Sequence, residues 1–260
     1  GTENCNIEFI NCNFINNYVD KANGGAIYID KKGNLKITNC NFTDNNAYDT
    51  DSSTIFGNGG AIYGNTESNI EIYNSIFTDN IATNDGGVIY GVTGSNIKVY
   101  NSNFSANSAK DGGVVYGDGN VTVDGSIFED NGATGNGGVV IGNNIILSNS
   151  EFTNNKATLG GAIYGISNLN VNNSTFTVNT ATNAGGAILW NNNANIIEST
   201  FINNIANYGG AIQGKNSPNS KGRVIKSTFT VNTATNAGGA INIEFPVNLT
   251  VIDSIFNDNS

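Results

Sequence analysis

The residues of this sequence that are able to do chemistry are mainly carboxylates, because the chain has no histidine and a single arginine, Arg223. Hydrolysis of a glycosidic bond needs two carboxylates set about 5–10 Å apart. The aspartates that share one position, two residues after a phenylalanine, stand in repeat units that are not contiguous: Asp44, Asp79, Asp130 and Asp258. Arg223 lies in a polar insertion. The pattern therefore favours a protein that is not an enzyme, and it predicts no cofactor.

The cysteines are the second candidate group. Cys12 and Cys40 both lie two residues before a phenylalanine, in consecutive repeat units. If the units stack directly, the two Cα atoms are ~5 Å apart, which permits a disulfide. Two reduced, stacked thiols are the favoured alternative, because buried free cysteine is common. Cys5 has no assigned partner, and no base for thiol catalysis is evident.

The tyrosines are the most suggestive group for binding. Each follows the motif Gly-Gly-(Ala/Val)-(Ile/Val) by one residue, and alternation along a strand sends it outward; the set is Tyr28, Tyr63, Tyr90, Tyr116 and Tyr164. Such a column could offer rings and hydroxyls to a glycan or a partner protein. The favoured alternative is that the rings only stabilise neighbouring strands. Trp190, next to Leu189, is expected on the same surface.

Composition limits the partners. The formal charge of −10 argues against nucleic acid, whose phosphates require lysine and arginine. No run of 18 apolar residues is present, so no membrane insertion is predicted. Asp49 and Asp51 could bind calcium weakly, but a solvated acidic loop is the favoured interpretation, and no metal site is predicted. Charged residues are only 12% and prolines two, with plentiful β-branched and aromatic residues, which indicates an ordered, strand-rich chain.

These residues are positioned by an internal repeat. The stretch STFTVNTATNAGGAI occurs at residues 174–188 and again at 227–241. More generally, a phenylalanine recurs every 24 to 35 residues, an asparagine follows it three positions later, and a Gly-Gly motif lies between consecutive phenylalanines. The pairs at the centre of the array are Phe104 with Asn107, Phe128 with Asn131, Phe152 with Asn155 and Phe176 with Asn179.

Repeat units of about 24 residues with short strands and frequent turns are typical of a parallel β-solenoid. The phenylalanines are expected to stack inward, and the asparagines to form a ladder of side-chain amides. We predict one domain over residues 1–260, with about ten rungs and loop insertions near 46–58 and 215–222. The array begins and ends inside a unit, so we expect a piece of a longer repetitive protein.

The alternating GGAI and F-x-x-N motifs resemble the repeats of the polymorphic outer-membrane proteins of chlamydiae. They also resemble the repeats of adhesin-like proteins of methanogenic archaea, particularly in asparagine-rich stretches such as FTNNKATLGGAIYG, residues 152–165. The resemblance covers the whole chain and implies a right-handed parallel β-helix, displayed on a surface and taking part in attachment. It carries no ligand site, because the shared motifs are structural columns.

The expected function is therefore that of an extracellular adhesin-like protein at the cell surface or cell wall. Its expected partner is a host or microbial cell-surface glycan or protein. A structural stalk or cell-wall component without a binding site in this segment is the alternative. A polysaccharide lyase or hydrolase, as occurs among β-helices, is the third interpretation.

Overall fold

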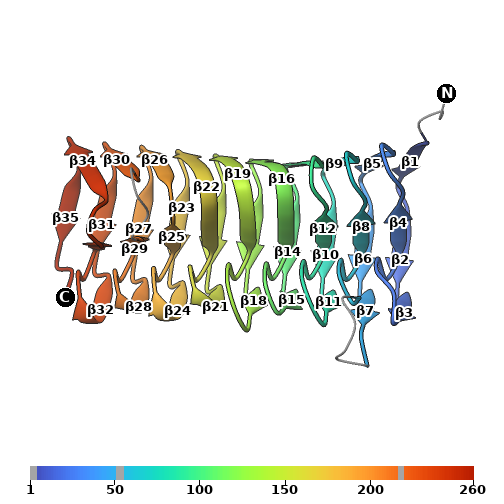
Figure 1. Ribbon diagram of the computed structural model, residues 1–260, viewed down its shortest axis with the longest axis horizontal. Helices are drawn as coiled ribbons and strands as arrows, with labels where there is room; N and C mark the ends of the chain where they lie inside the picture. Colours follow the sequence, from blue (N-terminus) through green and yellow to red (C-terminus); the bar gives the residue numbers. More distant parts are fainter. Residues whose placement is uncertain (1–4, 51–55, 216–219) are drawn as a thin grey trace.

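The computed structural model describes residues 5–50, 56–215 and 220–260, and every regular element in these residues is a β-strand. The strands coil from β1 (Asn6–Ile10) at one end to β35 (Ile255–Asn257) at the other (Figure 1). All pairing between strands is parallel, and the coil is a right-handed solenoid of about nine turns. The predicted fold class is therefore confirmed. Among the described residues, no helix has the length and hydropathy needed to cross a membrane.

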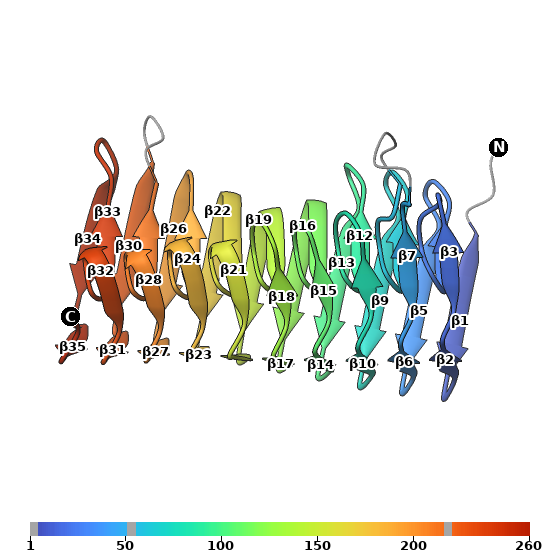
Figure 2. The ribbon, with the colours of Figure 1, turned by 90° about the horizontal axis from the view of Figure 1, so that it is seen from below.

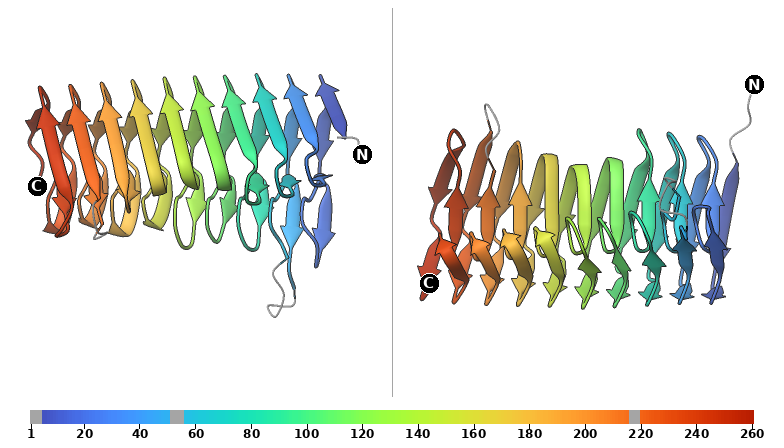
Figure 3. Two further views of the ribbon diagram at one scale, coloured as in Figure 1. Left: turned by 45° about the horizontal axis from the view of Figure 1, so that its top comes forward. Right: turned by 60° about the horizontal axis from the view of Figure 1, so that its bottom comes forward.

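Three parallel sheets run along the coil, as Figures 2 and 3 show from other sides. The phenylalanine sheet consists of β2 (Asn13–Ile15), β6 (Asn41–Thr43), β10 (Ile76–Thr78), β14 (Asn103–Ser105), β17 (Ile127–Glu129), β20 (Glu151–Thr153), β23 (Thr175–Thr177), β27 (Thr200–Ile202), β31 (Thr228–Thr230) and β35. The second sheet consists of β3 (Tyr18–Asp20), β7 (Asn46–Tyr48), β11 (Ile81–Ala82), β15 (Ser108–Ala109), β18 (Gly132–Ala133), β21 (Lys156–Leu159), β24 (Thr180–Ala184), β28 (Ile205–Tyr208) and β32 (Thr233–Ala237).

The third sheet has two arms. The arm that follows the Gly-Gly motif consists of β4 (Ile27–Ile29), β8 (Ile62–Gly64), β12 (Ile89–Gly91), β25 (Ile188–Trp190), β29 (Ile212–Gly214) and β33 (Ile241–Ile243). The other arm consists of β1, β5 (Asn34–Thr38), β9 (Asn69–Tyr73), β13 (Asn96–Tyr100), β26 (Asn193–Ile197), β30 (Lys221–Ile225) and β34 (Asn248–Ile252). Three long strands run through both arms: β16 (Val115–Asp124), β19 (Val140–Ser148) and β22 (Ile163–Asn172).

The phenylalanine column forms the core. Consecutive rings from Phe14 to Phe256 stack with centroids 4.3–4.9 Å apart and interplanar angles of 3–10°. The rings from Phe42 to Phe229 are fully buried. Burying each ring contributes roughly 1.5–3 kcal/mol. The predicted stack through Phe104, Phe128, Phe152 and Phe176 is confirmed.

The asparagine ladder is also confirmed. Each asparagine donates from Nδ2 to Oδ1 of the asparagine in the next rung at 2.7–3.1 Å, through Asn107, Asn131, Asn155 and Asn179 in the middle of the array. The second Nδ2 hydrogen is donated to the phenylalanine carbonyl of the preceding rung, as from Asn131 to Phe104 at 3.0 Å. Both hydrogens and the oxygen of each buried side-chain amide therefore take part in hydrogen bonds, as burial of a polar group requires.

Two left-handed residues bound each phenylalanine strand. The residue two after each of the ten phenylalanines of the column has φ between 49° and 57°, and it is Asn16, Asp44, Asp79, Ala106, Asp130, Asn154, Val178, Asn203, Val231 or Asp258. The residue three before each phenylalanine is also left-handed, with φ of 45–61°. Asparagine and aspartate tolerate this conformation best after glycine. The recurring aspartates considered above as catalytic carboxylates therefore have a conformational role.

The two glycines of each Gly-Gly motif have different roles. The first has a positive φ of 60–72° in all nine copies. The second packs against the next rung: a Cβ on Gly161, for example, would lie 2.0 Å from the carbonyl oxygen of Gly186. One glycine therefore makes the turn, and the other permits the close approach of adjacent rungs.

The expectation for Trp190 was wrong, because its side chain is completely buried. Alternation along β25 turns Trp190 to the side opposite Leu189, into the same column as Gly165 and Gly214. A Cβ on Gly214 or Gly222 would lie 2.7 Å from Cζ2 of Trp190, so the indole occupies the space that these glycines leave. Trp190 is thus a core residue and not part of a binding face.

Cys12 and Cys40 do occupy one column, in neighbouring rungs, and both are free thiols, as is the exposed Cys5. The backbone N–H of Cys12 donates to Sγ of Cys40 at 3.3 Å. The stacked arrangement is therefore the one observed. From Ser75 onward, serine takes this column and its hydroxyl accepts the equivalent N–H, as Ser102 does from Ser75 at 3.1 Å.

The predicted insertions were placed too widely. Residues 46–48 belong to β7 and residues 221–222 to β30, because their backbones continue the ladders of the preceding rungs. Arg223, which was expected in the insertion, also lies in β30, where it pairs with Asn195. Residues 51–55 and 216–219 lie outside the described residues, and with them Asp51 of the suggested calcium site. The backbone N–H of Asp49 donates to Oγ1 of Thr83 at 2.7 Å. Within the described ranges, no three histidine, cysteine, aspartate or glutamate residues are grouped to hold a metal ion.

Candidate binding faces

The tyrosine column lies on the arm that follows the Gly-Gly motif. Tyr28, Tyr63, Tyr90 and Tyr116 pair in register across β4, β8, β12 and β16. Their rings stack in sequence with centroids 5.1, 5.4 and 5.0 Å apart and interplanar angles of 14°, 3° and 15°. Four of the five predicted tyrosines therefore form one continuous stack that faces away from the core.

The fifth tyrosine is separate from this stack. Ile141, which is buried, lies between Tyr116 and Tyr164 in the column. The hydroxyl of Tyr164 accepts a hydrogen bond from Nδ2 of Asn191 at 2.9 Å. Beyond Tyr164 the column continues with buried Leu189 and Gln213. The tyrosine face is therefore confined to the first rungs.

The stacking decides what this face presents. The two faces of the Tyr63 ring and of the Tyr90 ring are covered by neighbouring tyrosines, so these rings direct their edges and hydroxyls outward. Tyr28, at the end of the stack, is 52% exposed, and its hydroxyl accepts a hydrogen bond from Nδ2 of Asn65 at 3.2 Å. The column is thus a row of phenol groups more than a platform for ring stacking.

A groove of about 810 Å³ runs along Tyr28, Tyr63 and Tyr90, the first three tyrosines of the stack, and we call it the tyrosine groove. The wall opposite the rings comes from the segments that precede each Gly-Gly motif. The lining residues are Asn23, Tyr28, Phe56, Asn58, Tyr63, Asn84, Asp85, Tyr90, Val92 and Lys110. Phenol, amide, carboxyl and ammonium groups therefore converge on one elongated hollow.

Burial sets the protonation states in the tyrosine groove and at Tyr116 beside it. It raises the pKa of Tyr63, of Tyr90 and of Tyr116, the last to about 12, so these hydroxyls are neutral at physiological pH. Burial, followed by the charge of Asp111, raises the pKa of Asp85 to about 6. Asp85 and Asp111 face each other in adjacent rungs through a parallel bridge. The groove therefore contains one carboxyl group whose pKa is raised to about 6.

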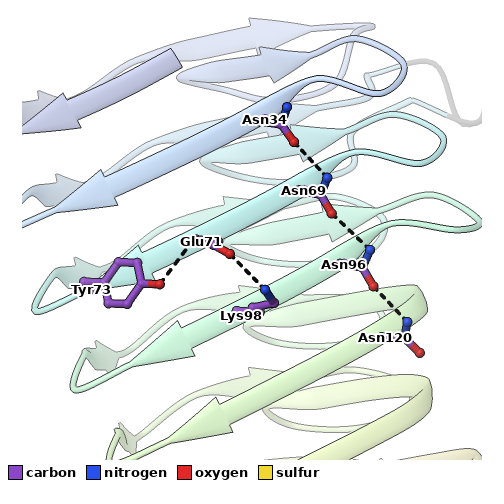
Figure 4. A network of polar contacts seen from close by, with 7 residues as sticks. All are labelled: Asn34, Asn69, Glu71, Tyr73, Asn96, Lys98 and Asn120. Atoms are coloured by element: carbon purple, nitrogen blue, oxygen red, sulfur yellow. Dashed lines mark hydrogen bonds and ion pairs between the residues drawn. The ribbon is translucent and has the colours of Figure 1, made fainter. Parts of the chain in front are cut away.

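A second polar face escaped the sequence-based prediction. It lies on the other arm of the third sheet, where an outward asparagine occupies the first position of the arm in eight successive rungs. Figure 4 shows four of these asparagines. Each Nδ2 donates to Oδ1 of the asparagine in the preceding rung at 2.7–3.2 Å, in the order Asn6, Asn34, Asn69, Asn96, Asn120, Asn144, Asn168 and Asn193. The signal was available in the sequence, since each of these asparagines directly precedes an inward aliphatic residue.

Charged residues form the next column of the same face. Nζ of Lys36 lies 2.9 Å from Oε1 of Glu8, and Nζ of Lys98 lies 2.9 Å from Oε1 of Glu71. Figure 4 shows Glu71 between Lys98 and the hydroxyl of Tyr73, which donates to Oε2 at 3.2 Å. The hydrogen bond from Lys98 lowers the pKa of Glu71. A hollow of about 670 Å³ lies between the amide and charge columns, and we call the whole surface the amide-charge face.

The comparisons agree with this geometry. Residues 1–176, more than half of the chain, match the family described as the right-handed beta helix region. Residues 198–215 match the Chlamydia polymorphic membrane protein repeat. The chain therefore belongs to the right-handed β-helix family, and the repeat match over residues 198–215 agrees with the resemblance that the sequence motifs indicated. No curated protein matches the chain.

Proposed function

We propose that this chain is the attachment region of an extracellular, adhesin-like cell-surface protein and that its tyrosine groove binds glycan on a host or microbial cell. The repeat match supports a surface protein, because that repeat is named for membrane proteins. The observation that carries the proposal is the stack of four outward tyrosines, three of which line an 810 Å³ groove.

The chemistry of the groove suits sugars. Neutral phenols both donate and accept hydrogen bonds, and the amides of Asn23 and Asn84 add further donors and acceptors. Polyhydroxylated ligands need such paired groups in a concave site. The carboxyl group of Asp85 accepts hydrogen bonds once it is ionised. We propose attachment without chemical turnover, although β-helical folds also occur in enzymes.

The test is a glycan array probed with the wild-type chain and with two variants of tyrosines that line the groove, Tyr63→Phe and Tyr90→Phe. Phenylalanine keeps the stacked ring and removes only the hydroxyl, so we expect each variant to lose about fivefold to tenfold in affinity. Tyr18→Phe is the matched control, because Tyr18 is 72% exposed and does not line the groove. Binding that the two phenylalanine variants leave unchanged would place the ligand elsewhere.

A structural stalk is the second candidate. The observation in its favour is that the tyrosines stack on each other and so stabilise neighbouring strands. A stalk predicts no signal on glycans or on cells, but a lower melting temperature for Tyr90→Ala. Capture of a protein ligand in place of a glycan would keep the adhesin proposal and change the partner.

A further inference from the structure

The first four rungs of the amide-charge face carry alternating charges along the axis of the coil. Glu8, Lys36, Glu71 and Lys98 follow one another in neighbouring strands β1, β5, β9 and β13. Their side chains are 33–51% exposed. The sum of these four charges is zero, whereas the whole chain carries −10. This strip is therefore a place where two copies of an acidic molecule can approach without meeting like charge.

We propose that the amide-charge face docks on the same face of a second copy of the chain, in antiparallel orientation. A two-fold axis that runs along the strand direction, between β5 and β9, keeps each column opposite itself and reverses the order of the rungs. Lys36 then faces Glu71 of the second copy, and Glu8 faces Lys98 of the second copy. The contact is isologous, because every pairing occurs twice.

The charge order selects both the orientation and the register. A parallel arrangement of the two coils would place Glu8 opposite Glu8 of the second copy. A shift of the two-fold axis onto β5 would place Lys36 opposite Lys36 of the second copy. Like charges in contact across an interface are costly and exclude wrong arrangements. The axis between β5 and β9 is thus the position that gives four opposite-charge pairs.

The flanking columns are compatible with this register. Asn34 faces Asn69 of the second copy, and each ladder amide retains one hydrogen and one lone pair beyond those used in the ladder. On the other side of the charges, Ile10, which is 52% exposed, faces Tyr100 of the second copy. Facing sheets pack about 10 Å apart, which leaves room for lysine and glutamate side chains between them.

The contact is small. Four rungs and five-residue strands cover an area of about 19 by 17 Å on each copy, so the two copies together bury roughly 650 Å², less than stable protein interfaces do. Exposed ion pairs contribute little each. The association is therefore weak for free chains, and it becomes effective when many copies are anchored on facing surfaces, because the effective concentration is then high.

The experiment is analytical ultracentrifugation of the chain up to about 1 mM, a range suited to a weak interface. We expect the wild type to dimerise, and Lys36→Glu and Glu71→Lys each to remain monomeric, since both place like charges in contact. An equimolar mixture of these two variants restores all four opposite-charge pairs, so we expect heterodimers. A monomeric wild type, or variants that dimerise as well as the wild type, overturns the proposal.

A second pair of variants guards against local misfolding. Ile10→Ser removes an exposed side chain from the contact, and we expect the dissociation constant to rise about fivefold, by loss of buried apolar area. Ile146→Ser is the matched control, since Ile146 is 50% exposed on the same face but lies beyond the four rungs. Equal behaviour of the two serine variants overturns the proposal. Tyr90→Phe leaves dimerisation unchanged, which separates this contact from the tyrosine groove.

Discussion

The backbone N–H and Nδ2 of Asn131 both donate to Oδ1 of Asn155, at 3.0 and 3.1 Å, inside a core that excludes water. The same contact, in which one oxygen accepts two hydrogen bonds from the neighbouring asparagine, recurs along the ladder. Because the asparagine side chain is buried and cannot bond to water, it must pair with the asparagine of the next rung. This pairing aligns each rung on the next. The repeated asparagine therefore determines the register of the coil as well as its stability.

Asn155→Leu should destabilise the chain by about 3–5 kcal/mol, because it leaves two buried donors of Asn131 without an acceptor. It also removes the hydrogen bond that Asn155 donates to the carbonyl oxygen of Phe128. Urea denaturation followed by circular dichroism measures the change. Asn103→Leu is the matched control: Asn103 is exposed, and its substitution should change the unfolding free energy by no more than about 0.5 kcal/mol. Similar losses for the two variants would show that the ladder contributes little.

Val178→Asn should stabilise the chain by about 1 kcal/mol, since valine is held at φ 57° and left-handed β-branched residues are strained. Val231→Asn, at φ 55° in the second copy of the duplicated segment, should do the same. The reverse change, Asn203→Val at φ 52°, should cost a similar amount. Melting temperatures test the three together, and a stabilising Asn203→Val would contradict the explanation.

Gly161→Ala should be among the most damaging single changes, with a loss of about 3 kcal/mol or more, because its Cβ would lie 2.0 Å from the Gly186 oxygen. Gly132→Ala tests the same substitution where space is open, with the nearest atom 3.8 Å away. We expect that variant to be neutral or slightly stabilising. Soluble yield and denaturant midpoints report the difference, and a well-folded Gly161→Ala would refute the close-packing argument.

The stability of the chain should depend on pH through Asp85. Its pKa rises from 3.8 to about 6 on folding, mainly because of burial. The folded state therefore binds more protons than the unfolded state between these values, so the unfolding free energy should fall as pH rises through that window. Asp85→Asn should lack this component. Denaturation of both chains from pH 4 to 7 measures it, and parallel profiles would rule it out.

The repeat could be predicted from the sequence because each rung places the same residue types over those of its neighbour. Like residues stack on like, so the columns of Phe104 and Asn107 could be predicted from spacing alone. Trp190 was assigned to the face of Leu189, although alternation along the strand turns these neighbours to opposite sides. The space that Gly214 and Gly222 leave for the indole is visible only in three dimensions. The insertion limits were misplaced because backbone pairing, which continues into Asn46–Tyr48 and Lys221, has no residue signature.

The repeat period and the alternation along strands predicted a parallel coil, its inward columns and the outward direction of the tyrosines, whereas the right-handed sense of the coil was implied by the resemblance to known repeats. Tertiary structure decided which outward groups meet. Only the register of rungs shows that Tyr28, Tyr63, Tyr90 and Tyr116 cover one another's ring faces. Likewise, only that register places Lys36 against Glu8 and Lys98 against Glu71. The number of residues between two such groups varies with the length of the loops in each rung. Their distance in space stays at one strand spacing, so the contacts cannot be read from sequence separation.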